Sequence, residues 1–265
     1  FPIGHTGFQK LIGRADLCLD RLAHDVDRRK PDLIAIMLGM NDCMNEGAAT
    51  NYEANVVRLV TRLKASNPQA RFIWMTPSPY DSGVSLSPDR LGPHPERAER
   101  LRQYAAFLRA WQREHGGLLV DFNAAMEDFN RTAQTEDQTF TLCGADRVHP
   151  QDIGGYFMAR VFLRDVGLLS WKVPQSIAAL KSDFETWQMR NDTPAGRLVV
   201  ERNREQAEFR TLHMIRWQLE TLERRNADDF AALRALESSF NGRSGQFEDR
   251  VRRYLKEWPR VHETD

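Results

Sequence analysis

Residues 32–42 read DLIAIMLGMND, and this stretch decides how the rest of the chain is interpreted. A run of mostly branched apolar residues continues without alternation from Leu33 to Leu38 and stops at Gly39. A short, continuous apolar run that ends in turn residues is typical of a strand buried on both faces, as in a parallel sheet. The sequence therefore predicts a buried parallel strand over residues 32–38.

The residues that follow this strand are candidates for a binding or catalytic role. Ligands of parallel sheets bind beyond the carboxyl ends of the strands, which is where residues 39–42 would lie. The side-chain amide of Asn41 can donate a hydrogen bond to a developing oxyanion, and Gly39 allows a close approach of the backbone. Glycine and Asn-Asp are also common in simple turns, so this stretch alone leaves both interpretations open.

A second informative stretch is CGADRVHP, residues 143–150, which precedes a helical pattern. Asp146 and His149 lie three residues apart and can form the orienting half of a catalytic triad. The carboxylate would hold one imidazole nitrogen while the other accepts a proton from a nucleophile. Pro150 suits the first position of a helix, which would place His149 at a rigid loop–helix junction. An isolated Asp-x-x-His pair is more often a solvated pair in a loop, so this motif alone does not establish a triad.

Together the two stretches resemble the SGNH (GDSL-type) hydrolases. The resemblance covers roughly residues 1–167 and rests on Gly-x-Asn-Asp after a buried strand and on Asp-x-x-His-Pro about a hundred residues later. It implies an α/β fold, a three-layer αβα flavodoxin-like parallel sheet, incomplete here at its N-terminus. It also implies that Asn41 is the oxyanion-hole side chain, Asp146 the orienting acid and His149 the general base.

A second donor to the oxyanion hole is implied by the same resemblance. The family's second motif block carries a glycine whose N–H joins the oxyanion hole, within a Gly-x-Ser/Thr-Gly sequence. Residues 4–7, GHTG, match this pattern, which assigns the role to Gly7. Gly13 is the alternative, because its separation from Asn41 along the chain also fits.

The sequence departs from the family at the nucleophile. The family's first block, Gly-Asp-Ser on the first strand, should precede the second by a few dozen residues, but the chain begins at Phe1 and contains no Gly-Asp-Ser. The serines in the following region are not at a strand-to-helix turn: Ser66, Ser78, Ser82, Ser85 and Ser87. We therefore expect a truncated SGNH hydrolase that lacks its nucleophile and its central first strand. Such a piece should be inactive and poorly soluble alone, because the neighbouring strands would have exposed edges.

Strand and helix patterns alternate through residue 166. Further strands are predicted over residues 71–76 and 118–122, and the predicted amphipathic helices cover 14–30, 56–67, 101–115, 123–133 and a segment after 150. This alternation is typical of a doubly wound parallel sheet. We assign residues 1–170 to the hydrolase domain.

Residues 171–265 have a different character and are assigned to an α-helical extension. Three stripes of apolar residues at helical spacing, over 212–222, 230–240 and 247–258, are separated by dense charge. Two roles for these helices stay open. They can dock onto the hydrolase domain, or they can join copies of the chain into a homo-oligomer.

Charge and cysteine content limit the classes of partner. Lys+Arg and Asp+Glu both number 37, which does not favour nucleic acid or an anionic membrane as a partner. No apolar run approaches the ~18 residues of a membrane span. Cys18, Cys43 and Cys143 are odd in number and widely spaced, so we predict no disulfide framework and no metal site. No organic cofactor is implied.

The sequence thus favours a serine-type ester hydrolase that forms an acyl-enzyme. Its substrate would be a small-molecule or carbohydrate ester, so the enzyme would be a carboxylesterase or a carbohydrate-ester deacetylase. One alternative is an acyltransferase of the same fold, since a sugar hydroxyl can resolve the same acyl-enzyme in place of water. A second is a non-catalytic SGNH-like protein that binds partners through its helices.

Overall fold

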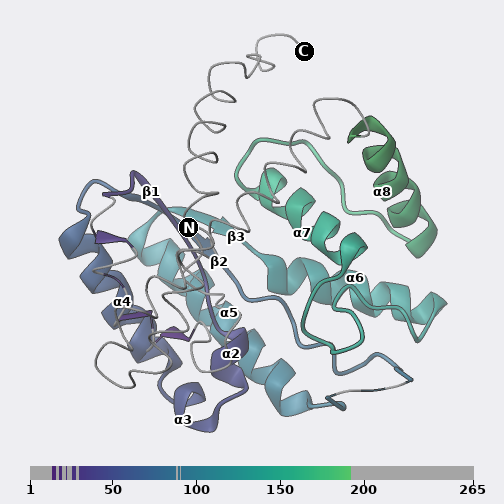
Figure 1. The fold of residues 1–265 in the computed structure, drawn as a ribbon, viewed down its shortest axis with the longest axis horizontal. Coiled ribbons are helices and arrows are strands. Elements are labelled where there is room, and N and C mark those ends of the chain that lie inside the picture. Colours follow the sequence, from purple (N-terminus) through teal and green to yellow (C-terminus); the bar gives the residue numbers. More distant parts are fainter. Residues whose placement is uncertain are drawn as a thin grey trace, which may run out of the picture. The chain divides into compact units, whose positions relative to one another are not determined.

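The computed structural model describes residues 14, 15, 18, 19, 22, 26, 27, 30–87, 89 and 91–191, with side chains up to residue 189. The chain divides into two compact units, Phe1–Trp187 and Gln188–Asp265, and the elements below belong almost entirely to the first. In chain order they are β1 (Leu33–Met37), α2 (Met40–Cys43), α3 (Glu46–Ala49), α4 (Tyr52–Ser66), β2 (Arg71–Met75), α5 (Pro95–His115), β3 (Leu118–Val120), α6 (Phe122–Glu136), α7 (Asp152–Asp165) and α8 (Ile177–Asn191) (Figure 1).

The three described strands form a parallel sheet in the order β1-β2-β3. Leu33 pairs with Arg71 and Ile73 pairs with Leu118, so the carboxyl ends of all three strands lie along one edge. Helices α4 and α5 connect the strands, as a parallel sheet requires. The predicted α/β class with a parallel sheet is confirmed.

Strand β3 is shorter than predicted. It ends at Val120, because the side chain of Asp121 accepts a hydrogen bond from the backbone N–H of Ala124 and thereby caps α6. An aspartate in the N-cap position satisfies one of the N–H groups that the first helical turn leaves unpaired. Phe122 therefore begins α6, where the sequence had predicted the last residue of a strand.

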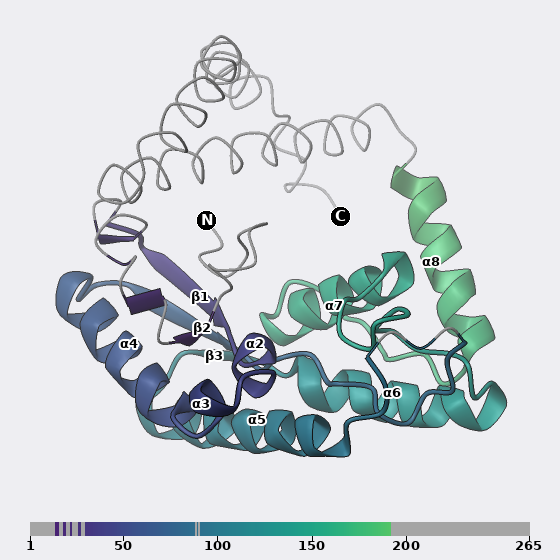
Figure 2. The same ribbon diagram turned by 60° about the horizontal axis from the view of Figure 1, so that its bottom comes forward.

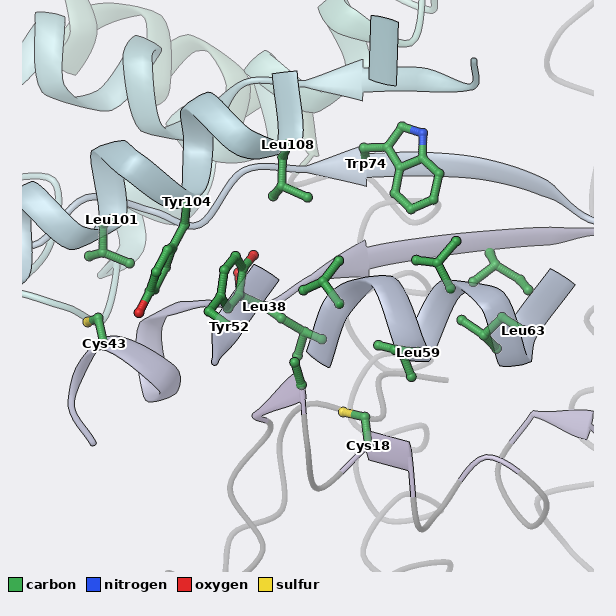
Figure 3. Packing of buried hydrophobic residues seen from close by; sticks show 14 of the residues in the cluster. Cys18, Leu38, Cys43, Tyr52, Leu59, Leu63, Trp74, Leu101, Tyr104 and Leu108 are labelled. Atoms are coloured by element: carbon green, nitrogen blue, oxygen red, sulfur yellow. The ribbon is translucent and has the colours of Figure 1, made fainter. Parts of the chain in front are cut away.

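Helices cover both faces of the sheet. Helices α4 and α5 cover one face (Figure 2). There Ile34, Phe72 and Trp74 belong to a buried cluster that also contains the apolar stripes of α4 and α5. Figure 3 shows part of this cluster, with Trp74, Leu59 and Leu108 labelled. On the other face Ile73 and Val120 belong to a second cluster, which they share with α6 and α7. The described part of the chain therefore has three layers, with the sheet in the middle.

Strand β1 is not buried on both faces, contrary to the prediction. Ile34 is 9% exposed, whereas Leu33 and Met37, on the opposite face, are 48% and 43% exposed. The cluster shared with α6 and α7 reaches Ile73 and Val120 on β2 and β3 but does not include a residue of β1. The sequence pattern showed that the strand is apolar, but it could not show which part of the sheet the helices cover.

The region after residue 166 packs onto the same unit. Ile177 and Leu180 of α8 are buried in the cluster that contains Phe157 and Val161 of α7, and Trp171 packs against it. The predicted domain boundary at residue 170 stays a prediction. The apolar stripes over 212–258 lie outside the described residues.

Candidate active site

The turn after β1 has a conformation that only glycine adopts readily. Gly39 has a φ of 129°, and a Cβ atom at this position would lie 3.1 Å from Pro77 Cγ and 3.2 Å from Tyr104 Cδ2. Such a positive φ is strained for any residue with a side chain. The backbone N–H of Cys43 donates to the Gly39 carbonyl at 2.8 Å and closes the short helix α2. This turn places Asn41 in α2, directly beyond the carboxyl end of β1.

Aromatic packing holds this turn in place. The rings of Tyr52 and Tyr104 stack with their centroids 3.8 Å apart, and Tyr52 Oη donates to the Leu38 carbonyl at 3.1 Å. Leu38 and Cys43, on either side of the turn, are both buried (Figure 3). Asn41 itself is half-buried. Packing on both sides of Asn41 thus fixes the backbone of the turn that carries it.

Asp146 and His149 are hydrogen-bonded to each other. Asp146 Oδ2 lies 2.5 Å from His149 Nδ1, and Asp146 Oδ1 accepts the backbone N–H groups of Val148 at 3.1 Å and of His149 at 2.9 Å. Burial raises the pKa of the Asp146 carboxyl. The hydrogen bonds from His149 and Val148 outweigh burial, so this pKa lies below its usual value. Asp146 is therefore a carboxylate at neutral pH and holds the ring of His149.

This geometry is what a general base needs. A proton on Nδ1, donated to Asp146, leaves Nε2 as the ring nitrogen that can accept a proton. The side chain of His149 is 63% exposed, which keeps the ring accessible to a substrate. The predicted loop–helix junction is displaced, because α7 begins at Asp152 with Gln151 as its N-cap. Pro150 thus precedes the helix instead of starting it.

The loop that carries this pair lies at the same edge of the sheet as Asn41. The segment that leaves the carboxyl end of β2 bonds to it, since the Asp81 N–H donates to the Arg147 carbonyl at 3.1 Å. Val148 also belongs to the buried cluster that contains Leu38, next to the turn after β1. Asn41 and the Asp146–His149 pair therefore lie beyond the carboxyl ends of the strands, although they come from distant parts of the chain.

The other predicted site residues have different outcomes. Gly7 and Gly13 lie outside the described residues, so their assignment stays a prediction. Two ring side chains near the loop after β2 have partners within the protein. Tyr80 is buried, and its hydroxyl donates to the Gly92 carbonyl at 2.7 Å. His94 pairs through Nδ1 with Glu96 at 2.7 Å.

The two cysteines near the site motifs are poorly suited to act as nucleophiles. Cys43 and Cys143 are buried free thiols. Burial raises the pKa of Cys43 to about 12 and also raises the pKa of Cys143. A thiol must ionise to act as a nucleophile, so both stay unreactive near neutral pH. Their role in this part of the chain is packing.

Sequence analysis missed the residues that surround the Asp146–His149 pair. The Arg147 side chain is 3% exposed and forms an ion pair with Asp89, and Asp81 accepts a further hydrogen bond from Arg147 through its carbonyl. Arg147 lies between the two residues of the Asp-x-x-His motif, so the sequence analysis could have considered it. Its partners follow β2 in an irregular, proline-rich segment, where no periodic pattern points to them.

A known family matches this part of the chain. The model of the GDSL-like lipase/acylhydrolase family matches residues 4–155, which include both the turn after β1 and the loop with Asp146 and His149. The chain belongs to this family. The resemblance stated from the two motifs is therefore confirmed at the level of family.

Individual relatives of this GDSL-like chain include an acetylxylan esterase. An acetylxylan esterase of Geobacillus stearothermophilus is 30% identical over 158 residues, which make up 56% of this chain and 64% of that enzyme. The chain thus spans less than two thirds of that relative's length. A crystal structure of an acetylxylan esterase from this organism has a TM-score of 0.47 and 27% identity, over 60% of this chain and 69% of that one. A gut microbial diltiazem-metabolizing enzyme has a TM-score of 0.51 and 25% identity, over 59% of this chain and 38% of that one.

Among the described residues, no three His, Cys, Asp or Glu side chains are grouped so that they could hold a metal ion. Within the same part of the chain, no helix combines the length and apolar character needed to cross a membrane. The Asp146–His149 loop and the turn with Asn41 are therefore the features on which a function can be argued.

Proposed function

We propose that this chain supplies the general base, its orienting acid and part of the oxyanion hole of a serine-type ester hydrolase. The observation that carries the proposal is the 2.5 Å contact between Asp146 Oδ2 and His149 Nδ1 at the edge of the sheet where Asn41 lies. The family assignment supports it, since its members are lipases and acylhydrolases. We place the nucleophilic serine outside the 265 residues, because Gly-Asp-Ser does not occur among them.

In the proposed reaction a seryl hydroxyl attacks the acyl carbonyl while His149 Nε2 takes its proton. Asp146 stabilises the imidazolium that forms, and the Asn41 amide donates a hydrogen bond to the oxyanion. A backbone N–H of Gly7, or alternatively of Gly13, would be a further donor. His149 then protonates the leaving alcohol. In the second half of the reaction His149 activates a water molecule, which releases the acid from the acyl-enzyme.

For the substrate, we propose an ester of a carbohydrate, with an acetyl group as the first to test. The support is the acetylxylan esterase to which the chain is 30% identical. No metal or organic cofactor takes part in the proposed reaction. An acyltransferase would use the same residues, so the assay should include an alcohol acceptor and measure both free acetate and acetylated acceptor.

The decisive experiment replaces His149 in the whole gene product and measures hydrolysis of an acetylated xylo-oligosaccharide and of 4-nitrophenyl acetate. We expect His149→Ala to lower kcat by about three orders of magnitude or more, as for the base of a triad. His115→Ala is the matched control, because His115 ends α5 and contacts Trp111, with ring centroids 3.8 Å apart. It should retain full turnover. A loss of less than tenfold in His149→Ala would remove this residue from the mechanism.

A further inference from the structure

The side chain of Arg147, between the two motif residues, is held by two residues, Asp89 and Asp81. Its Nε lies 3.1 Å from Asp89 Oδ1, and its Nη2 donates to Asp89 Oδ2. Its Nη1 donates to the Asp81 carbonyl at 2.7 Å. An arginine fork that meets a carboxylate with two nitrogens fixes both position and orientation, unlike a single charge contact. The guanidinium is therefore a clamp between the motif loop and the segment after β2.

The backbone of Arg147 is also unusual. Its φ is 65°, in the left-handed region, and Lys30 is the other non-glycine residue in the described part with a positive φ. A residue with a side chain is uncommon in this conformation. The Arg147 N–H donates to the Gly144 carbonyl at 3.1 Å and closes a tight turn. The side-chain contacts on Asp89 and Asp81 hold this turn in a form that an isolated loop would not favour.

The segment that Arg147 grips is itself anchored. Three side chains donate to Asp81 Oδ2: Asn130 Nδ2 at 2.9 Å, Gln134 Nε2 at 2.9 Å and Thr141 Oγ1 at 2.6 Å. Asn130 and Gln134 belong to α6. Asp81 is buried, so these contacts are shielded from water. Arg147 thus connects the motif loop, through Asp81, to a helix of the core.

The direction of the turn at Arg147 determines where His149 points. Asp146, the residue before it, accepts the N–H groups of Val148 and His149 with one oxygen and the His149 ring with the other. A rotation of the backbone at residue 147 would move all three donors relative to the carboxylate. A triad base tolerates little displacement, since about 1 Å can reduce the rate about a hundredfold.

We propose that Arg147 is a positioning residue of the Asp146–His149 pair, which it aims by clamping the motif loop onto Asp89 and Asp81. The proposal rests on the proposed function, because it gives Arg147 a role in aiming a base. The Arg147 side chain is buried, so we expect no direct contact with the ester. Its removal should therefore change the orientation of the base and the rate of the chemical step, with little effect on substrate binding.

Arg147→Gly is the most informative variant. Glycine adopts a φ of 65° without strain, so this change removes the side-chain clamp while it permits the native backbone. The first readout is the tautomer of His149, that is, which of its two ring nitrogens carries the proton. It is measured from the ring ¹⁵N chemical shifts at pH 8 in the full chain. We expect wild type to carry the proton on Nδ1, facing Asp146. In Arg147→Gly the fraction with the proton on Nε2 should rise, as it should in Asp146→Asn.

The second readout is kinetic. In the active gene product, Arg147→Gly should lower kcat about 10- to 100-fold, with KM changed by less than about threefold, as for a misplaced catalytic group. Arg147→Lys retains the charge but not the fork, so it should restore part of the rate. Arg109→Met is the control for loss of an ion pair, because Arg109 Nε lies 2.6 Å from Asp121 Oδ2 between α5 and the start of α6. It should lower stability while kcat and the tautomer stay as in wild type.

The outcomes separate the two proposals. If His149→Ala keeps its turnover, the proposed function fails, whatever the tautomer shows. If His149→Ala is inactive but Arg147→Gly keeps both wild-type kcat and the Nδ1 tautomer, the positioning role of Arg147 is overturned. If Arg147→Gly does not fold, Asp89→Asn, which keeps the bond from Arg147 to Asp81, replaces it. This variant should change the tautomer and kcat in the same direction, and an unchanged result would overturn the role.

Discussion

The turn after β1 and the loop of residues 142–149 bring their functional groups to the same edge of the sheet, but different forces hold them. Close packing fixes the first, where a methyl group on Gly39 would approach Pro77 Cγ to 3.1 Å and Tyr104 Cδ2 to 3.2 Å. Charged and polar side chains fix the second, through Arg147 and Asp89. Asn41 would donate from a side chain on a packed backbone turn, whereas the ring of His149 is also held by a hydrogen bond to Asp146.

This difference makes the two regions sensitive to different changes. A packed turn is disturbed by added atoms, because the surrounding side chains have little space to move. An ion-paired loop is disturbed when a charge is lost, since its partner is then left without compensation. Gly39→Ala adds atoms to the packed turn, whereas Asp89→Asn removes a charge from the ion-paired loop.

After His149→Ala, the largest effect is expected from Asn41→Ala in the active gene product. Removal of one oxyanion donor should lower kcat by about 10²–10³. Stability should change little, because the packed backbone of the turn stays in place. Asn51→Ala is the matched control, as the Asn51 amide donates to the Gly47 carbonyl at 3.1 Å on an exposed part of the chain. Wild-type turnover in Asn41→Ala would remove Asn41 from the oxyanion hole.

A smaller effect, on stability, is expected from Gly39→Ala. The alanine would have to adopt a φ of 129° and approach Pro77 Cγ to 3.1 Å, so unfolding should become easier by about 1–3 kcal/mol. The urea midpoint measures this change. Gly155→Ala, in α7, is the control, since its Cβ would meet nothing within 4 Å, and it should match or exceed wild-type stability. Equal midpoints for Gly39→Ala and wild type would show that the turn is not tightly packed.

Much of the fold was readable from the sequence because its signals are local. The apolar run at β1 and the helical spacing of Val56, Leu59 and Leu63 in α4 predict these elements without knowledge of their partners. The same holds for Asp146 and His149, which are close in the chain and therefore close in space. The family resemblance followed from such short patterns.

What the sequence did not reveal depends on contacts between distant segments. Arg147 and Asp89 are 58 residues apart, and both lie in irregular segments where no periodicity links them. The exposure of Leu33 and Met37 depends on how far α6 and α7 extend across the sheet. The sequence predicted that α7 starts at Pro150, because proline suits the first position of a helix. In the structure Gln151 is the N-cap and Asp152 the first residue. The preference of proline alone did not determine this start.

The smallest predicted effect is on how stability depends on pH. It distinguishes the loop that carries His149 from the turn after β1. The hydrogen bonds from the Arg147 guanidinium lower the pKa of Asp89 to about 2, whereas an unfolded chain has an aspartate pKa of about 3.9. A carboxyl whose pKa is lowered by folding stabilises the protein above its unfolded pKa. That contribution is lost as the pH falls towards the folded value, here from about pH 4 to about pH 2.

Asp89→Asn should therefore be less stable than wild type at pH 6, and the difference in urea midpoint should shrink as the pH falls from about 4 towards 2. The reason is that wild type loses its Asp89–Arg147 pair by protonation, while the variant has no charge at this position to lose. Gly39→Ala provides the contrast, because its strain does not depend on a proton, and its difference from wild type should stay constant over the same range. A constant difference for Asp89→Asn as well would mean that packing, and not the ion pair, holds the loop that carries His149.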